Sequence, residues 1–113
     1  MYIAVRADLT PGQQLAQATH AAFHMACDWP TMTAEWLRES NFLVVVAAPD
    51  EEALAQLAGR AVEEGLVRVI VREPDLSNAI TAVALQPGSD ARRLCAELPL
   101  ALKAKVQGDL TMV

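Results

Sequence analysis

The chain has 113 residues, of which 53% are hydrophobic, and a formal net charge of −5. This length fits one domain with a single core, and the apolar content is far above that of a disordered chain. The charge disfavours tight RNA binding, because proteins that bind RNA tightly usually carry an excess of Lys and Arg to neutralise phosphates.

No segment of the sequence is typical of a membrane span or a secretory signal. The longest apolar run, 42–49, is far shorter than the roughly 20 residues that cross a bilayer, and residues 1–5 lack a basic region and a long apolar stretch. Cys27 and Cys95 show no metal-binding spacing. We expect a cytoplasmic protein without membrane contact, in which both cysteines are buried and reduced.

The first part of the chain predicts a strand followed by a long helix. Residues 2–5 are β-branched and aromatic, as in a strand. Thr10 can cap a helix, Pro11 suits the first helical position, and Gln13 completes a capping box. The helix is expected to continue to about residue 27, with small side chains that let it lie close against a sheet. Its predicted apolar stripe consists of Leu15, Ala18, Ala22, Met25 and Ala26.

The middle of the chain predicts a short helix, a buried strand and a third helix. The short helix is expected over 31–39. Residues 42–47 are apolar at consecutive positions, which is typical of a strand covered on both faces. Acidic residues at 50–52, which we interpret as solvated, favour the start of a helix that Gly65 ends. The predicted inner stripe of this helix is Leu54, Leu57, Ala58, Ala61 and Val62.

The last part predicts two strands, over 66–71 and 80–85, and a helix over about 90–97. The resulting order is β-α-α-β-α-β-β-α. Helices interspersed between strands predict an α/β fold, with a single four-stranded mixed sheet covered by helices on both faces. We expect one domain over 1–113, and the tail from about residue 103 receives no assignment.

Four places collect polar residues that the packing pattern does not require. They are Arg6 and Asp8 after the first strand, Gly12 and Gln13 at the first helix, Glu73 and Asp75 after the third strand, and Ser77 and Thr81 beside the fourth. Ligands of open α/β sheets bind at strand ends and helix N-termini, so these residues form a candidate site. From the residues alone, Gln13 is explained as well by an ordinary helix cap, and Glu73 by an ordinary turn acid. A threonine at a strand start, such as Thr81, is more often structural than catalytic.

Two stretches of sequence resemble the signatures of the type II peptidyl-tRNA hydrolases. The first combines 5–9 (VRADL) with 12–22 (GQQLAQATHAA), similar to an Arg-x-Asp-Leu strand end, a Gly-Lys helix start and an Ala-Gln-x-x-His-Ala run. The second combines 72–77 (REPDLS) with 81–87 (TAVALQP), where the family has an acid after a strand, then two hydroxyl residues. The resemblance extends over roughly residues 2 to 98.

The resemblance implies hydrolysis of the ester that joins a peptidyl group to the tRNA 3′ ribose, with no metal or organic cofactor. It implies that Glu73 orients or deprotonates a water or a hydroxyl, that Ser77 and Thr81 position it, and that the helix start at Gln13 meets the developing negative charge. The substrate contacts implied are Arg6, Asp8, Gly12, Gln17, His20 and Asp75. Without the resemblance, His20 is interpreted as a hydrogen-bonded packing residue, and His20 with His24 lacks the third ligand that a metal site needs.

Gln13 stands where the family has lysine, and this departure leaves a second hypothesis open. A lysine adds a full charge to the positive end of a helix, and losing such a stabiliser costs a factor of about 10²–10³ in turnover. Arg6 could compensate. The alternative is a catalytically weak or inactive relative, a homodimeric module that binds a small ligand or a protein. An unrelated regulatory domain with a similar order of elements is a third interpretation.

Overall fold

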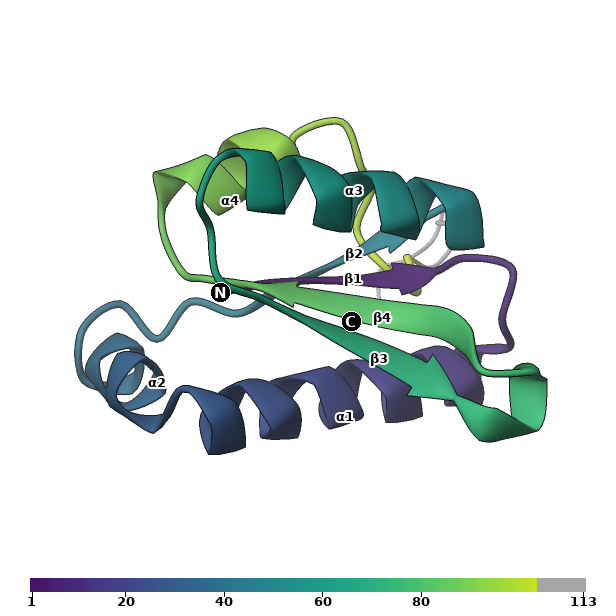
Figure 1. Ribbon diagram of the computed structural model, residues 1–113, viewed down its shortest axis with the longest axis horizontal. Helices are drawn as coiled ribbons and strands as arrows, with labels where there is room; N and C mark the ends of the chain where they lie inside the picture. Colours follow the sequence, from purple (N-terminus) through teal and green to yellow (C-terminus); the bar gives the residue numbers. More distant parts are fainter. Residues whose placement is uncertain (104–113) are drawn as a thin grey trace, which may run out of the picture.

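The computed structural model describes residues 1–103, which form one sheet between two layers of helices (Figure 1). The elements are β1 (Tyr2–Arg6), α1 (Pro11–Asp28), α2 (Pro30–Arg38), β2 (Val44–Ala48), α3 (Glu51–Glu63), β3 (Arg68–Glu73), the 3₁₀ turn η1 (Pro74–Leu76), β4 (Ala79–Leu85) and α4 (Ser89–Leu94). The order of strands and helices is the one that the sequence predicts. The tail left unassigned, from residue 104 on, lies outside the described residues.

The sheet is mixed, with the spatial order β2-β1-β4-β3. β1 pairs parallel with β2 and antiparallel with β4, and β3 pairs antiparallel with β4. Helices α1 and α2 lie on one face, and α3 and α4 lie on the other (Figure 1). Alternate side chains of β1 therefore enter different cores: Ile3 and Val5 pack toward α1, whereas Ala4 packs toward α3. The predicted fold class is confirmed.

Helix α1 begins with the predicted capping box. The Gln13 backbone N–H donates to Thr10 Oγ1 at 3.2 Å, and the Thr10 backbone N–H donates to Gln13 Oε1 at 3.0 Å. The predicted inner stripe is partly wrong, because Leu15 is 63% exposed. The helix lies across β1, β4 and β3 rather than β2, so a neighbouring row of side chains faces the sheet. The buried row is Gln14, Gln17, Ala18, Ala21 and Met25.

Helix α3 begins at a capping aspartate, because Asp50 Oδ1 accepts from the Ala53 N–H at 2.9 Å. The interpretation of 50–52 as a purely solvated run is wrong for Glu51, whose Oε2 accepts from the Ile80 N–H of β4 at 2.8 Å. Val62 is 54% exposed and does not belong to the inner stripe, since it follows the buried Ala61 by about 100° around the helix.

The cysteines differ from the expectation that both are buried. Cys95 is buried after α4, and burial raises the pKa of its thiol to about 11. Cys27 is exposed, because it lies two positions from the buried Met25 on the solvent side of the last turn of α1.

β2 is an edge strand, and residues 99–101 run along its outer side. The Ala47 N–H donates to the Pro99 carbonyl at 2.8 Å, and the Ala101 N–H donates to the Val45 carbonyl at 2.9 Å. Pairing of this kind satisfies backbone groups that an edge strand would otherwise expose. Among residues 1–103, no helix has the length and apolar character needed to cross a membrane.

Candidate functional site

A chain of hydrogen bonds joins three elements at one end of the sheet. The buried Thr81 of β4 donates from Oγ1 to Gln17 Oε1 at 2.7 Å, and Gln17 Nε2 donates to Glu73 Oε2 at 3.1 Å. Gln17 comes from α1 and is 6% exposed, while Thr81 is completely buried. Both polar atoms of the Gln17 amide are therefore engaged. One oxygen of the Glu73 carboxylate is therefore held by Gln17, whose own side chain is fixed by Thr81.

The turn after β3 fixes the other carboxylate oxygen of Glu73. Glu73 ends β3 because Pro74 cannot continue the ladder, and its Oε1 accepts from the Asp75 N–H at 3.2 Å. The Asn78 N–H donates to the Glu73 carbonyl at 3.0 Å, and Ser77 and Asn78 close the turn in left-handed conformations. The carboxylate is thus held at both oxygens, and each keeps a further lone pair for a ligand.

The Glu73 carboxylate and the first turn of α1 line the same pocket. This pocket has a volume of about 220 Å³, and its walls are Leu9, Gln13, Gln17, Glu73, Asp75 and Leu76. The sequence predicted that the tip of the first helix and the bend after the third strand belong to one site. Their shared pocket is the geometric basis for treating them as one candidate site.

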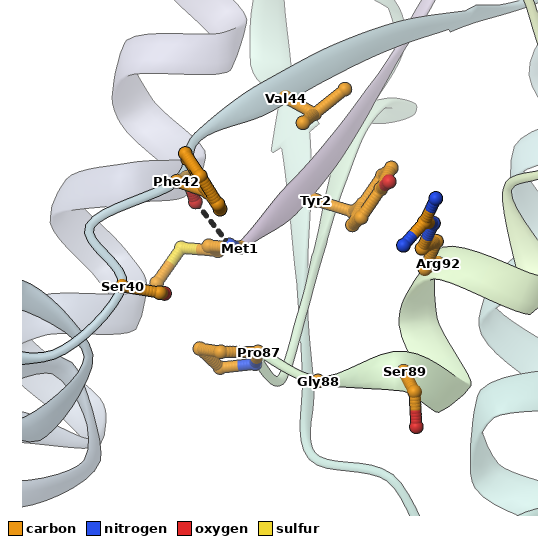
Figure 2. A pocket seen from close by; sticks show the side chains of 9 residues that line it. All are labelled: Met1, Tyr2, Ser40, Phe42, Val44, Pro87, Gly88, Ser89 and Arg92. Carbon is orange, nitrogen blue, oxygen red and sulfur yellow. Dashed lines mark hydrogen bonds between the residues drawn. The ribbon is translucent and has the colours of Figure 1, made fainter.

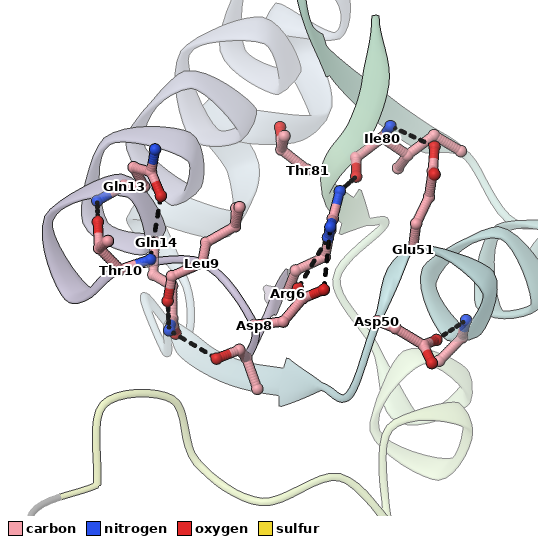
Figure 3. A network of polar contacts seen from close by, with 12 residues as sticks. Arg6, Asp8, Leu9, Thr10, Gln13, Gln14, Asp50, Glu51, Ile80 and Thr81 are labelled. Atoms are coloured by element: carbon pink, nitrogen blue, oxygen red, sulfur yellow. Dashed lines mark hydrogen bonds and ion pairs between the residues drawn. The ribbon is translucent and has the colours of Figure 1, made fainter. Parts of the chain in front are cut away.

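The Gln13 side chain has one hydrogen-bonded end and one free end. Its Oε1 is occupied by the Thr10 N–H of the capping box, as Figure 3 shows. Within the part of the chain that the structure describes, its Nε2 has no acceptor. Gln13 therefore lines the pocket with a neutral side chain at the position where the family signature has a lysine.

Arg6 and Asp8 form a separate network beside the pocket. Arg6 Nε and Nη2 donate to the two Asp8 carboxylate oxygens at 2.9 and 3.0 Å, and Nη1 donates to the Ile80 carbonyl at 3.3 Å (Figure 3). The hydrogen bond from Arg6 lowers the pKa of the Asp8 carboxyl, and the same bond raises the pKa of Arg6. Neither residue lines the pocket. The Arg6 guanidinium is thus paired with a carboxylate outside the pocket wall.

The remaining predicted residues are spread around this centre. Asp75 lines the pocket, and Gly12 is exposed in the first turn of α1 beside Gln13. Ser77 is exposed, and neither Ser77 nor Thr81 is part of the pocket wall. His20 is exposed on α1 away from the wall, so the interpretation as a hydrogen-bonded packing residue is wrong.

Sequence reasoning missed the two leucines of the pocket wall and the role of Gln14. Gln14 is 7% exposed, and its Nε2 donates to the Leu9 carbonyl at 2.8 Å, which ties the loop before α1 to the helix. The available signal was the spacing of Gln14 and Gln17 with Ala18 and Ala21, which places all four on one side of a helix. Among residues 1–103, no group of three His, Cys, Asp or Glu side chains is arranged to hold a metal ion.

Comparisons with known proteins agree on one family. Residues 1–97 match the model of the family described as Peptidyl-tRNA hydrolase PTH2. The peptidyl-tRNA hydrolase of Methanocaldococcus jannaschii is 32% identical over an alignment of 102 positions, and the match covers 81% of this chain and 89% of that protein. The peptidyl-tRNA hydrolase of Pyrobaculum aerophilum is 32% identical over an alignment of 120 positions, and the match covers 99% of this chain and 95% of that protein.

A solved structure resembles the whole fold. It is a protein of unknown function from Agrobacterium tumefaciens, with a TM-score of 0.65 and 15% sequence identity, and the match covers 88% of this chain and 94% of that one. At this identity the likeness concerns the fold alone.

Proposed function

Because this chain belongs to the PTH2 peptidyl-tRNA hydrolase family, we propose that it hydrolyses the ester between a peptidyl group and the 3′ end of tRNA. The products are a free peptide and a tRNA that can be charged again for translation. One observation carries the proposal at the level of residues: the Glu73 carboxylate, held by Gln17, shares a pocket with the first turn of α1.

In the proposed reaction, Glu73 acts as the general base. It accepts a proton from a water molecule while the water oxygen bonds to the carbonyl carbon of the ester. The bond between this carbon and the ribose 3′ oxygen then breaks, and the proton passes from Glu73 to the departing oxygen. A positioned base of this kind contributes a factor of about 10²–10⁴. The bonds from Gln17 and from the Asp75 N–H support the role, because they hold the carboxylate in one orientation.

The first turn of α1 is proposed to stabilise the negative charge that develops on the carbonyl oxygen of the ester. The positive end of a helix favours an anion, and the Gln13 Nε2 group adds a donor to the wall of the pocket. The helix end is open at Gly12, since a Cβ atom there would meet no atom within 4 Å. We propose that Gly12 and Asp75 border the bound substrate, and that the Arg6–Asp8 pair holds the loop before α1.

Thr81 and Gln17 are proposed as positioning residues. Replacing Thr81 by valine keeps the shape of the buried side chain but removes the donor to Gln17 Oε1. We expect kcat to fall by about tenfold with little change in KM, and the free energy of unfolding to fall by about 1–3 kcal/mol. Steady-state kinetics and thermal unfolding measure the two effects. Serine at position 81 keeps the hydroxyl and should restore most of kcat; a threonine with a purely structural role would lower stability and leave kcat unchanged.

Ser77 and His20 are proposed to contact the substrate. The Ser77 hydroxyl follows the turn that carries Glu73, so we propose that it contacts the substrate rather than the reacting water. His20 lies on α1, one turn beyond Gln17, where its exposed ring is available to the nucleotide end of the substrate. Aromatic side chains commonly stack on unpaired RNA bases.

The alternative of an inactive binding module is not favoured by the family match or by the two relatives, which are both named as hydrolases. The net negative charge of the chain still predicts weak binding of tRNA. Because few phosphates are neutralised, we expect KM for peptidyl-tRNA to depend less on salt than in a basic RNA-binding protein. We also propose that the protein works in the cytoplasm, where translation supplies its substrate.

We further propose that two copies of the chain pair through α1. Its solvent side carries Leu15, 63% exposed, and Phe23, 67% exposed. Large apolar side chains exposed together are typical of interaction surfaces. Sedimentation equilibrium should give the mass of a dimer, and Leu15→Asp with Phe23→Asp should give a monomer. A wild-type monomer at concentrations up to about 100 µM, where a weak dimer of this size should form, would contradict the pairing.

The direct test of the function uses N-acetyl-aminoacyl-tRNA as substrate. Wild-type protein should release free tRNA with the N-acetyl amino acid, and Glu73→Ala should not. Release that is equally absent from wild type and mutant would contradict the proposal. A chain that binds peptidyl-tRNA without turnover would instead support the binding module.

A further inference from the structure

A second pocket lies at the opposite end of the sheet from Glu73. Its volume is about 490 Å³, and Figure 2 shows its walls: the start of β1, the segment before β2, the loop after β4 and the first turns of α4. It shares no lining residue with the pocket at Glu73. Tyr2 and Arg6 are the two ends of β1, so the two pockets are separated by a strand of about 13 Å.

The polar groups of this pocket suit an anion. Arg92 is a cation in its wall, which also includes the Met1 amine, and the wall residues with hydroxyl groups are Tyr2, Ser40 and Ser89. No carboxylate occurs among the residues that line it, although acidic residues outnumber basic ones by 14 to 9 in the chain. A guanidinium in a wall that carries no carboxylate suits an oxyanion ligand.

Arg92 is available to a ligand, unlike the arginine next to it. Arg93 binds the carboxylates of Glu64 and Asp90. Within residues 1–103, Arg92 makes no ion pair and no side-chain hydrogen bond. In Figure 2 its guanidinium extends toward the Tyr2 side chain. An unpaired guanidinium beside an aromatic ring can hold a carboxylate or a phosphate while the ring contacts the body of the ligand.

The rest of the wall is apolar and held in place. Phe42 is 75% exposed, and Val44 and Pro87 complete the apolar side. The backbone at Phe42 is fixed, since its carbonyl accepts from Trp36 Nε1 at 2.9 Å and from the Met1 amine at 2.5 Å.

A second, more apolar hollow of about 290 Å³ adjoins this pocket and shares Tyr2, Val44 and Arg92 with it. Its other wall residues are Val46, Cys95, Ala96, Leu98 and Leu100. Arg92 therefore lines both pockets, which together can hold an apolar group longer than one aromatic ring.

We propose that this double pocket is a binding site for a small organic anion that carries a carboxylate or phosphate head on Arg92 and an apolar body against Tyr2. The site is separate from the hydrolytic centre, and its ligand is neither the ester nor the water of the proposed reaction. The apolar body distinguishes the ligand from inorganic phosphate, which would use the head-group contacts alone.

The test is an NMR titration of the ¹⁵N-labelled full chain with 4-phenylbutyrate, its neutral amide 4-phenylbutyramide, phenyl phosphate and inorganic phosphate. Saturable shifts at the amides of Tyr2, Phe42, Gly88 and Ser89 are expected with phenylbutyrate or phenyl phosphate, and the tighter of the two identifies the head group. The neutral amide and inorganic phosphate should each bind at least about tenfold more weakly.

Arg92→Gln should weaken binding of the anionic probe at least about tenfold, whereas Arg93→Gln, the matched control, should leave it unchanged. Arg92→Lys keeps the charge and should retain part of the affinity. Glu73→Gln should bind the probe like the wild type even if the hydrolase proposal fails. Equal binding of phenylbutyrate and its amide, shifts confined to other residues, or undiminished binding by Arg92→Gln would each overturn the proposal.

Discussion

Replacing Glu73 by glutamine is expected to lower kcat for N-acetyl-aminoacyl-tRNA by about 10²–10⁴-fold. Glutamine has the size of glutamate and can still accept a hydrogen bond from Gln17, so the turn after β3 should keep its geometry. It cannot take the proton of a water molecule at neutral pH. The loss should therefore fall on kcat, with little change in KM or in the melting temperature.

The matched control for this variant is Asp75→Asn. Asp75 lines the same pocket, and the substitution removes the same charge two residues away. If the negative charge of the pocket merely repels tRNA, both variants should bind substrate better and neither should lose turnover. A wild-type kcat for Glu73→Gln, or an equally large loss for Asp75→Asn, would contradict the assignment of Glu73 as the base.

The second large effect is a gain: Gln13→Lys is expected to raise kcat by about 10²-fold. The Gln13 position lines the pocket that contains Glu73, so a lysine there adds a full charge to the end of α1 where negative charge develops. The same change removes the bond from the Thr10 N–H to Gln13 Oε1, and we expect a loss of about 1 kcal/mol in the free energy of unfolding. The variant should be faster and slightly less stable.

Gln56→Lys provides the control for added charge. Gln56 is exposed on α3, and the substitution changes the net charge by the same amount away from the pocket. A general gain in affinity for RNA would lower KM in both variants. An increase in kcat that is confined to Gln13→Lys would locate the effect at the tip of α1, and an unchanged kcat would mean that the pocket does not use a charge there.

The fold was predictable from sequence because its signals are local. The capping box at Thr10, the capping aspartate at Asp50 and the proline after Glu73 mark where elements begin or end, and each works within a few residues. Element boundaries were less accurate: β3 begins two residues later than expected, and α4 ends at Leu94 rather than near residue 97.

The side of each helix that faces the sheet was only partly predictable. Leu15 and Val62 are apolar and were expected inside, yet both are exposed, while Gln14 and Gln17 are polar and buried. Hydrophobicity alone cannot identify a buried glutamine, because its burial depends on partners distant in the chain. Gln17 meets Glu73 across 56 residues, and only the resemblance to a family pointed to Gln17 as part of the site.

The pocket at Arg92 could not have been predicted from any pattern in the sequence. Its walls come from four separate segments, and none of them carries a recognisable motif. Only the pairing of β1 with β2 and with β4 brings Tyr2, Val44 and the loop after Leu85 together.

A double-mutant cycle on single-turnover release of tRNA establishes whether the tip of α1 and Glu73 form one hydrolytic centre. Its variants are Gln13→Lys, Glu73→Gln and the double variant. If the tip of α1 and the Glu73 carboxylate serve one reacting ester, the gain from lysine should nearly vanish when the base is missing. If lysine accelerates the Glu73→Gln protein as much as it accelerates the wild type, the two groups act independently and do not form one hydrolytic centre.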